Sequence, residues 1–156
     1  MDLIRLIQDE DRDVRRSAAY ALGPAFACVP GKDQAWEDLV RLTQDEDRCV
    51  RERAANAVGA AFVHVSNKDH AWQDLHRMTQ YEDSYVRWRA AHAMVEAFSH
   101  VPDKDQAWQD LHGLTQDVER RVRGRAANAL GSVFVHIPDK DQAWKDLISL
   151  TRDESS

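Results

Sequence analysis

Cysteine, glycine and proline are all scarce in this sequence of 156 residues. The two cysteines, Cys28 and Cys49, cannot form a disulfide framework, which excludes a small secreted domain held together by disulfides. Six glycines and four prolines are too few for a β fold with many turns.

Long apolar stretches are also missing. No segment approaches the ~18 consecutive apolar residues of a transmembrane helix, and the first residues, MDLIRLIQDEDRD, lack the cationic flank and apolar core of a signal peptide. Disorder is excluded too, because 43% of the residues are hydrophobic and five tryptophans and four phenylalanines require burial. With a net charge of −6, the composition predicts a soluble, cytoplasmic protein with no membrane partner.

What the sequence does contain is a repeat of 36 residues. A tryptophan, a phenylalanine and a valine each recur at this step, in the series Trp36, Trp72, Trp108, Trp144; Phe26, Phe62, Phe98, Phe134; and Val14, Val50, Val86, Val122. Self-similarity at such a period is typical of stacked arrays. We therefore expect one repeat domain over 1–156, with copies at about 1–30, 31–66, 67–102 and 103–138 and a terminal half-repeat at 139–156.

Each copy contains two helical patterns, named here helix A and helix B. Helix A reads KDQAWxDLxxLTQ, as in 104–116, and follows a residue that favours the N-cap position. Helix B reads xxVRxRAANAxGxxFxH and follows an acidic turn such as 45–47, where carboxylates favour the helix dipole. Because such pairs are antiparallel and must stack, the sequence predicts an all-α fold: a right-handed α-solenoid of about nine helices, from a short helix A at 2–8 to a last one at 141–152.

Two further expectations concern packing within the stack. The four tryptophans of the repeat series are predicted to pack between helices, because their positions follow the repeat. Pro24 is expected to bend the first helix B or end it early, since a proline inside a helix removes a backbone hydrogen bond.

The columns of helix B divide into two sides. A column here is the set of residues at equivalent positions in the four copies. The columns that begin at 14, 18, 21, 22 and 25 stay nearly constant, whereas the columns that begin at 13, 16, 20, 24 and 27 vary freely. Steps of 3, 4, 4 and 3 keep the variable columns on one face of the helix. Helices in a stack lie about 8–10 Å apart, so the four variable stripes are predicted to form one continuous surface.

The third stripe carries the strongest binding signal. Tyr81, Tyr85, Trp88 and His92 follow one another at spacings of four, three and four residues, which predicts one aromatic helix face. Exposed Trp and Tyr are enriched at binding hot spots, although drift at unconstrained positions explains the pattern almost as well. The candidate partner-binding residues are Tyr20, Asn56, Tyr81, Tyr85, Trp88, His92, Glu96 and Asn128.

The helix B pattern resembles that of HEAT-like repeats of the phycobilisome-lyase type. The resemblance rests on the segments 45–59, 12–23 and 120–131, and on 84–95, where Val95 replaces the glycine. It covers essentially the whole chain and implies that helix B lines a concave face on which partners are held. It also suggests an archaeal or bacterial source.

An arginine recurs inside the otherwise apolar arc of helix B, at Arg15, Arg51, Arg87 and Arg123. A buried guanidinium needs a partner, since an unpaired buried charge is very unfavourable. The expected partners are the turn residues Asp11, Asp47 and Asp83, or the helix A residues Asp38, Asp74, Asp110 and Asp146. This arginine ladder is predicted to be structural and to fix the register between copies.

Catalytic and metal chemistry are not indicated. His64, His100 and His136 share one column, but equivalent positions lie about 10 Å apart and cannot bind one metal ion. No phosphate-binding loop, HExxH motif or activated nucleophile is present. We expect no cofactor and no enzymatic activity.

The leading hypothesis is a scaffold that binds a protein or peptide through helix B. The alternative is a nucleic-acid binder that uses the arginine-rich starts of helix B, such as 120–125, although the acidic turns and the negative net charge oppose it. A designed array is a third hypothesis, which irregular residues such as Glu96 and Val118 weaken. Both ends resemble cuts through a longer array, and self-association through these open ends is also expected.

Overall fold

The computed structural model describes residues 2–153 and contains no strand among them. The outermost residues of the two ends that resemble cuts, 1 and 154–156, lie outside the described residues. Within the described part of the chain the α-helices are α1 (Leu3–Leu6), α2 (Arg12–Ala25), α3 (Lys32–Leu42), α4 (Arg48–Ala61), α5 (Lys68–Met78), α6 (Ser84–Ala97), α7 (Lys104–Gly113), α8 (Arg120–Val133) and α9 (Lys140–Asp153). The all-α prediction is therefore confirmed, with a short first helix as expected.

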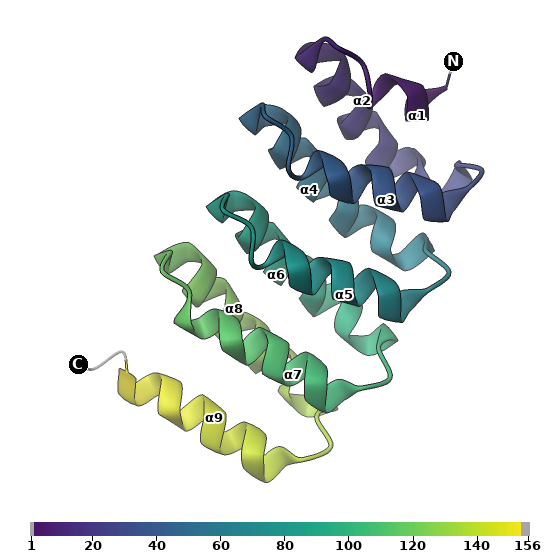
Figure 1. Ribbon diagram of the computed structural model, residues 1–156. Helices are drawn as coiled ribbons and strands as arrows, with labels where there is room; N and C mark the ends of the chain where they lie inside the picture. Colours follow the sequence, from purple (N-terminus) through teal and green to yellow (C-terminus); the bar gives the residue numbers. More distant parts are fainter. Residues whose placement is uncertain (1, 154–156) are drawn as a thin grey trace.

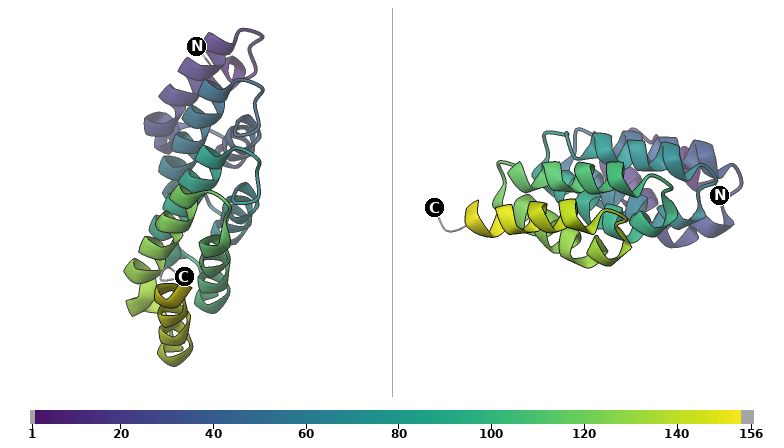
Figure 2. Two further views of the ribbon diagram at one scale, coloured as in Figure 1. Left: turned by 90° about the vertical axis from the view of Figure 1, so that its left-hand side faces the viewer. Right: turned by 90° about the horizontal axis from the view of Figure 1, so that it is seen from below.

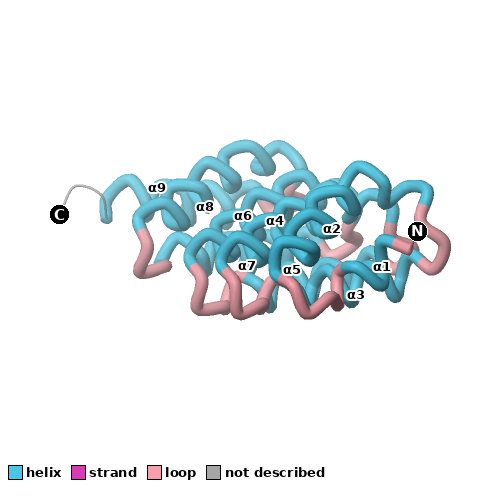
Figure 3. The backbone as a smooth tube through the Cα atoms, turned by 90° about the horizontal axis from the view of Figure 1, so that it is seen from above, coloured by secondary structure: helices cyan, strands magenta, loops and turns pink. Residues whose placement is uncertain are grey.

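The helices form two layers in a right-handed solenoid. The A helices α3, α5, α7 and α9 lie side by side in one layer, and the B helices α2, α4, α6 and α8 form the other layer behind it (Figure 1). The side views show the two layers as separate rows that run the length of the stack (Figures 2 and 3). Each pair of helices is antiparallel, and the pairs repeat with the period of the sequence.

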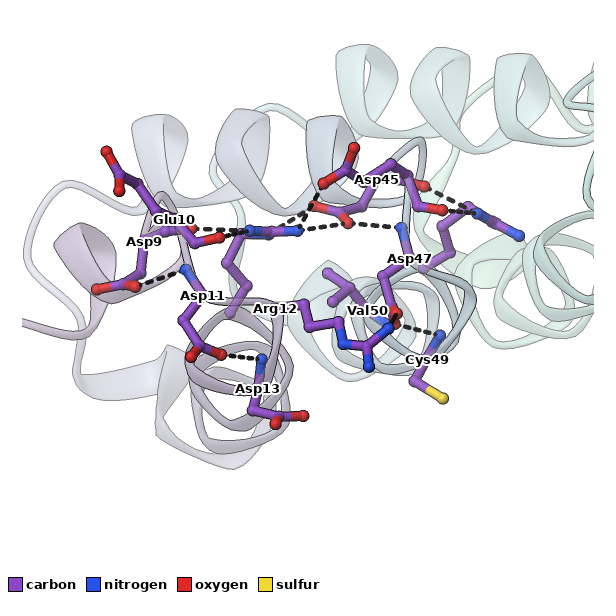
Figure 4. A network of polar contacts seen from close by, with 12 residues as sticks. Asp9, Glu10, Asp11, Arg12, Asp13, Asp45, Asp47, Cys49 and Val50 are labelled. Carbon is purple, nitrogen blue, oxygen red and sulfur yellow. Dashed lines mark hydrogen bonds and ion pairs between the residues drawn. The ribbon is translucent and has the colours of Figure 1, made fainter.

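Side-chain caps start most of the helices where the sequence predicts them. The Asp47 carboxylate accepts hydrogen bonds from the backbone N–H groups of Cys49 and Val50 at 2.9 and 3.2 Å, which satisfies two free donors at the start of α4 (Figure 4). Asp83 caps α6 in the same way. Glu119 stands at the equivalent position of α8 and makes no capping hydrogen bond with its side chain.

The sequence predicts that Pro24 bends the first helix B or ends it early, and the early end is wrong. Helix α2 runs on to Ala25 and has the same length of 14 residues as α4 and α6. Pro24 lies in the last turn, so it removes only the hydrogen bond to the carbonyl of Tyr20. Tyr20 is 63% exposed, and water can therefore serve that carbonyl.

Small side chains bring the B helices close together. A Cβ atom added to Gly23 of α2 would lie 3.4 Å from the Cα atom of Ala57 in α4, so the two backbones approach closely there. Successive B helices pack directly on one another, whereas successive A helices make few contacts. The B helices therefore form the more closely packed layer of the stack.

The prediction that all four repeat-series tryptophans pack between helices is correct for three of them. Trp36, Trp72 and Trp108 are buried, with at most 6% of each side chain exposed. Trp144 contacts Phe134 with its ring but is 57% exposed, because no further helix of the described chain covers it. Across residues 2–153, no helix combines the length and apolar character needed to cross a bilayer.

Candidate functional site

The arginine ladder is present, and its rungs connect consecutive repeats. Arg15 of α2 donates from Nε and Nη2 to both carboxylate oxygens of Asp45, at 2.9 and 3.1 Å, and from Nη1 to the carbonyls of Asp9 and Glu10. Arg87 repeats this arrangement with Asp117, at 2.8 and 3.1 Å. Both arginines are more than 90% buried, so these bidentate pairs satisfy cations that would otherwise be very costly.

Two rungs deviate from this geometry. At the position 30 residues after Arg51 stands Tyr81 instead of an aspartate, and Arg51 donates from Nε to Asp83 at 2.7 Å instead. Arg123 is exposed and donates to the carbonyls of Asp117 and Val118. Within the described side chains Arg123 has no carboxylate partner.

Most of the expected partners of the ladder are wrong. Asp83 is a partner, but Asp11 and Asp47 cap their own helices. On the A helices, Asp38 accepts from Gln34 and Arg41, and the other three expected aspartates accept from tryptophans. The actual partners are one column earlier in the turn, at Asp45 and Asp117. An aspartate stands 30 residues after both Arg15 and Arg87, but Tyr81 takes that position after Arg51, so the sequence alone did not single out this column.

The electrostatics of the ladder follow from these contacts. The hydrogen bond with Asp45 raises the pKa of Arg15 above its ordinary value, against the effect of burial. Burial would raise the pKa of Asp83, but the hydrogen bonds from the Arg51 guanidinium and from the backbone N–H groups of Val86 and Tyr85 outweigh it and lower that pKa. Both groups are therefore held in their charged forms.

A second ladder runs through the A helices, and the sequence reasoning missed it. The indole N–H of Trp36 donates to the Asp74 carboxylate of the next repeat at 2.8 Å, and Trp72 and Trp108 donate in the same way to Asp110 and Asp146 at 2.9 and 2.8 Å. A buried indole N–H needs an acceptor, and an aspartate recurs 38 residues after each of these tryptophans, so the repeat contained the signal. The tryptophans therefore supply both packing and a charge-assisted hydrogen bond.

The variable columns of helix B remain open to solvent. In all four repeats every residue of these columns is partly or fully exposed, whereas most residues of the constant columns are buried. Val63 and Val135, at the ends of two stripes, are 49% and 68% exposed. The B layer thus presents a surface whose chemistry differs from one repeat to the next.

An aromatic stack occupies this surface on α6. The rings of Trp88 and His92 are stacked, with centroids 6.1 Å apart and planes 17° from parallel, and the ring of Tyr85 lies 5.7 Å from Trp88 on the same helix. The Tyr85 hydroxyl donates to the Asn56 side-chain oxygen of α4 at 3.1 Å. Nε2 of His92 lies 3.6 Å from a carboxylate oxygen of Glu96. Five candidate residues therefore belong to one continuous set of contacts across two helices.

A cleft of about 600 Å³ opens beside the stack, between α6 and α8. We call it the α6–α8 cleft; its lining residues are Arg48, Ser84, Tyr85, Trp88, Glu119, Arg121, Gly124, Arg125 and Asn128. The guanidinium carbon of Arg125 lies 5.9 Å from the centre of the Trp88 ring, within cation–π range. Gly124 occupies the column that holds Trp88 in the previous repeat, and a Cβ atom there would meet no atom within 4 Å. The absence of a side chain at Gly124 keeps the cleft open.

Comparison with known families now supports the repeat assignment. The family model for HEAT repeats matches residues 2–94 and 39–131. This chain belongs to the HEAT repeat family. A comparison with curated proteins found no match.

Solved structures similar to this HEAT repeat protein include engineered and natural solenoids. A computationally designed armadillo repeat protein for modular peptide recognition has a TM-score of 0.64 at 18% identity, over 98% of this chain and 72% of its own. A designed armadillo repeat protein in complex with peptide (KR)4 has a TM-score of 0.62 at 18% identity, with coverages of 96% and 69%. The complex of CpcE and CpcF of phycocyanin lyase from Nostoc sp. PCC7120 has a TM-score of 0.51 at 19% identity, with coverages of 84% and 63%. At these identities the likeness concerns the fold.

The chain is shorter than several of the proteins that it resembles. It spans 66% of the length of one engineered protein, at 22% identity and a TM-score of 0.60, and 40% of a second one, at 23% identity and a TM-score of 0.59.

The remaining candidate residues of this HEAT array are not all gathered at the cleft. Tyr81 precedes α6, so the helical spacing predicted for it is wrong; it packs against the core and lines a different cleft, with Asp45 and Arg51. Burial raises the pKa of its hydroxyl. Tyr20 lies on α2, two repeats away, with the Arg53 guanidinium 4.9 Å from its ring centre. Asn128 lines the α6–α8 cleft itself.

Three of the histidines, His64, His100 and His136, stand at the ends of short 3-10 helices at 62–64, 98–100 and 134–136. In the described residues no three His, Cys, Asp or Glu side chains are placed to hold one metal ion. Cys28 and Cys49 are exposed, free thiols. These residues add no chemistry to the cleft.

Proposed function

We propose that this HEAT repeat protein is a non-enzymatic scaffold that binds a segment of another protein on its helix-B face. The contact would centre on the α6–α8 cleft, with Trp88 and Tyr85 as anchors and Asn56, His92, Glu96 and Asn128 around them. Tyr20 and Tyr81 would be outer contacts. The cytoplasmic location and self-association of the solenoid stay predictions from the sequence.

The observation that carries this proposal is an aromatic stack beside an open cleft. Trp88 is only partly buried, and its ring lies 5.7 Å from that of Tyr85, 6.1 Å from that of His92 and 5.9 Å from the guanidinium carbon of Arg125. A tryptophan held in place in this way loses little conformational freedom on binding, which makes it an efficient anchor. The designed armadillo protein in complex with peptide (KR)4 indicates that a solenoid of this general fold can hold a peptide.

The nucleic-acid alternative has less support at the level of side chains. Of the basic residues that favoured it, Arg51 pairs with Asp83, Arg48 pairs with Glu52 and Arg123 is bound to backbone carbonyls. Phosphate recognition usually needs a dominant basic face. The lyase neighbour concerns fold alone, and no arrangement in the described residues favours catalysis.

A matched pair of glycines on α8 offers a direct test. Gly124 and Gly131 both have open space around an added Cβ atom, but only Gly124 lines the cleft. A display library of random peptides is selected on the wild-type protein, and the enriched peptides are then measured against Gly124→Gln and Gly131→Gln. We expect Gly124→Gln to weaken binding at least tenfold and Gly131→Gln to leave it unchanged, with both variants folded by circular dichroism. If neither Gly124→Gln nor Trp88→Ala changes the affinity for the peptides, this face would be excluded as the docking site.

A further inference from the structure

Charge is distributed unequally between the two layers of the solenoid. A cleft between α5 and α7 on the helix A side is lined by the three aspartates Asp69, Asp103 and Asp110 and one arginine. The α6–α8 cleft on the helix B side is lined by three arginines and one glutamate. The chain as a whole has a net charge of −6, so this concentration of cations runs against the overall charge.

The arginines of the α6–α8 cleft are also unlike those of the ladder. Arg121 and Arg125 contact no carboxylate among the described side chains, whereas Arg87 makes a bidentate pair with Asp117. Nε of Arg125 is buried and has no hydrogen-bond acceptor, while its guanidinium is held against Trp88. Arg125 as a whole is only partly buried and lines the cleft, so the rest of its guanidinium group is open to an anionic ligand there. The cleft therefore contains cationic hydrogen-bonding capacity that the protein itself does not use.

We propose that the occupant of the α6–α8 cleft is an acidic peptide segment. A carboxylate side chain of the peptide would bind the guanidinium groups of Arg121 and Arg125, and a neighbouring apolar or aromatic side chain would pack on Trp88. Guanidinium groups bind carboxylates through paired, charge-assisted hydrogen bonds, and tryptophan supplies the apolar anchor. This proposal rests on the proposed function and specifies its ligand.

A peptide fits the B face better than a phosphate chain does. Asp13, Glu52 and Glu96 interrupt the basic residues of the variable columns, and Glu119 lies in the cleft itself. These carboxylates would repel a continuous row of phosphates. A peptide carries its charges at separate side chains, and it can place a carboxylate beside Arg121 and Arg125 while keeping neutral residues near Glu119.

The test measures the charge of the peptides that the full chain selects. Random peptides are selected on the wild-type protein and counter-selected on Gly124→Gln, which leaves those that need an open cleft. We expect these peptides to be net acidic, with an aromatic or branched apolar residue near the acidic one. Replacing their Asp and Glu residues with Asn and Gln is expected to weaken binding about tenfold, the effect of one lost charge-assisted hydrogen bond.

Variants of the protein provide the reciprocal measurement by fluorescence anisotropy. Arg125→Gln and Arg121→Gln should each weaken binding of an acidic peptide about tenfold, and binding should decrease with added salt. Glu119→Gln, at the only carboxylate of the cleft lining, should leave binding unchanged or strengthen it a few-fold. Arg5→Gln, at an exposed position of α1 far from the cleft, serves as the control for a general loss of positive charge and should leave binding unchanged.

The outcomes separate the two proposals. Cleft-dependent peptides that are neutral or basic would overturn the acidic-ligand proposal and leave the scaffold function in place. Peptides that bind equally well to Gly124→Gln and Trp88→Ala would overturn both. Binding of a labelled DNA or RNA oligonucleotide that requires Arg121 and Arg125, and that acidic peptides cannot displace, would show that the cations recognise phosphate.

Discussion

In the A layer the same contact recurs from repeat to repeat, whereas in the B layer the equivalent contacts change. Trp36, Trp72 and Trp108 each donate to an aspartate of the next repeat at 2.8 to 2.9 Å, and the ring of each lies 6.2 to 6.4 Å from that of a phenylalanine 26 residues later. On the solvent-facing side of the B helices the residues differ between repeats. The column that begins at position 20, for example, holds Tyr20, Asn56, His92 and Asn128. The first pattern fixes the register of the stack, and the second leaves a surface free to acquire a specific chemistry.

The comparison also explains why an acidic protein presents a basic cleft. Aspartates of the A helices and of the turns are engaged by the two ladders, while Arg121 and Arg125 project from the variable columns or beside them. Structural carboxylates and potential ligand-binding cations are thus separated by layer. Substitutions in the ladders and on the B face can therefore perturb the two regions separately.

The largest effect is expected from the buried arginine rung. Arg87→Met removes the cation from Asp117, whose side chain is only 9% exposed, and it leaves the carbonyls of Tyr81 and Glu82 without their donor. We expect the free energy of unfolding to fall by about 3–5 kcal/mol, measured by urea denaturation. Arg123→Met, at the exposed rung, should cost less than about 1 kcal/mol. Equal losses for both variants would show that the buried pair has no special role.

The tryptophan ladder should give the next largest loss. Trp72→Phe keeps most of the apolar packing but removes the indole donor to Asp110. The carboxylate then retains the hydrogen bond from Gln106 and the contact with His76 Nδ1 at 3.7 Å. A loss of about 1–3 kcal/mol is expected in the same denaturation experiment. Trp144→Phe is the matched control, because Trp144 is 57% exposed, and it should change stability by less than about 0.5 kcal/mol.

Acid should weaken the rung that joins Arg51 to Asp83. The pKa of Asp83 is lowered below its ordinary value of 3.8, so its contribution to stability is present at neutral pH and is lost as the pH falls through the lowered pKa. Asp83→Asn retains a residue that caps helices well and should cost about 1 kcal/mol at neutral pH. Thermal unfolding as a function of pH should show the gap between wild type and variant closing below about pH 4. A gap that stays constant down to pH 2 would contradict the ion pair.

The smallest expected effect is an increase in stability, and it comes from a substitution on the B face. Gly124→Ala places a better helix former in α8 with no atom within 4 Å of the new Cβ, so stability should rise by about 0.5–1 kcal/mol. The rise is expected in the thermal midpoint as well. A loss of stability would mean that Gly124 is required for the fold and is not simply a space in the surface.

The sequence predicts the helices and their stacking well, because the same residues recur at equivalent positions in each repeat. The spacing of the tryptophans and the acidic turns gave the helices and the stack, and the variable columns identified the exposed side of helix B. The partners within the ladders were harder to predict. Both Asp45 and Asp47 follow Arg15 at similar distances along the chain, and only the three-dimensional turn decides that Asp45 faces the guanidinium while Asp47 caps α4.

The candidate site was predicted only in part for a related reason. Helical spacing correctly grouped Tyr85, Trp88 and His92, which lie on one helix, but wrongly added Tyr81, which precedes that helix. The contribution of α8 depends on contacts between repeats, such as that of Arg125 with Trp88, and on the space left by Gly124. No single helix pattern contains that information.

The tryptophan side chains themselves provide the most direct test of the central claim. In an NMR titration of the full chain with a cleft-selected acidic peptide, the indole N–H signals of both regions can be followed in one spectrum. The account predicts that the Trp88 signal shifts with the peptide concentration, while the signals of Trp36, Trp72 and Trp108, which are hydrogen-bonded within the ladder, stay in place. Shifts confined to the ladder tryptophans or to Trp144, with Trp88 unchanged, would contradict docking at the α6–α8 cleft.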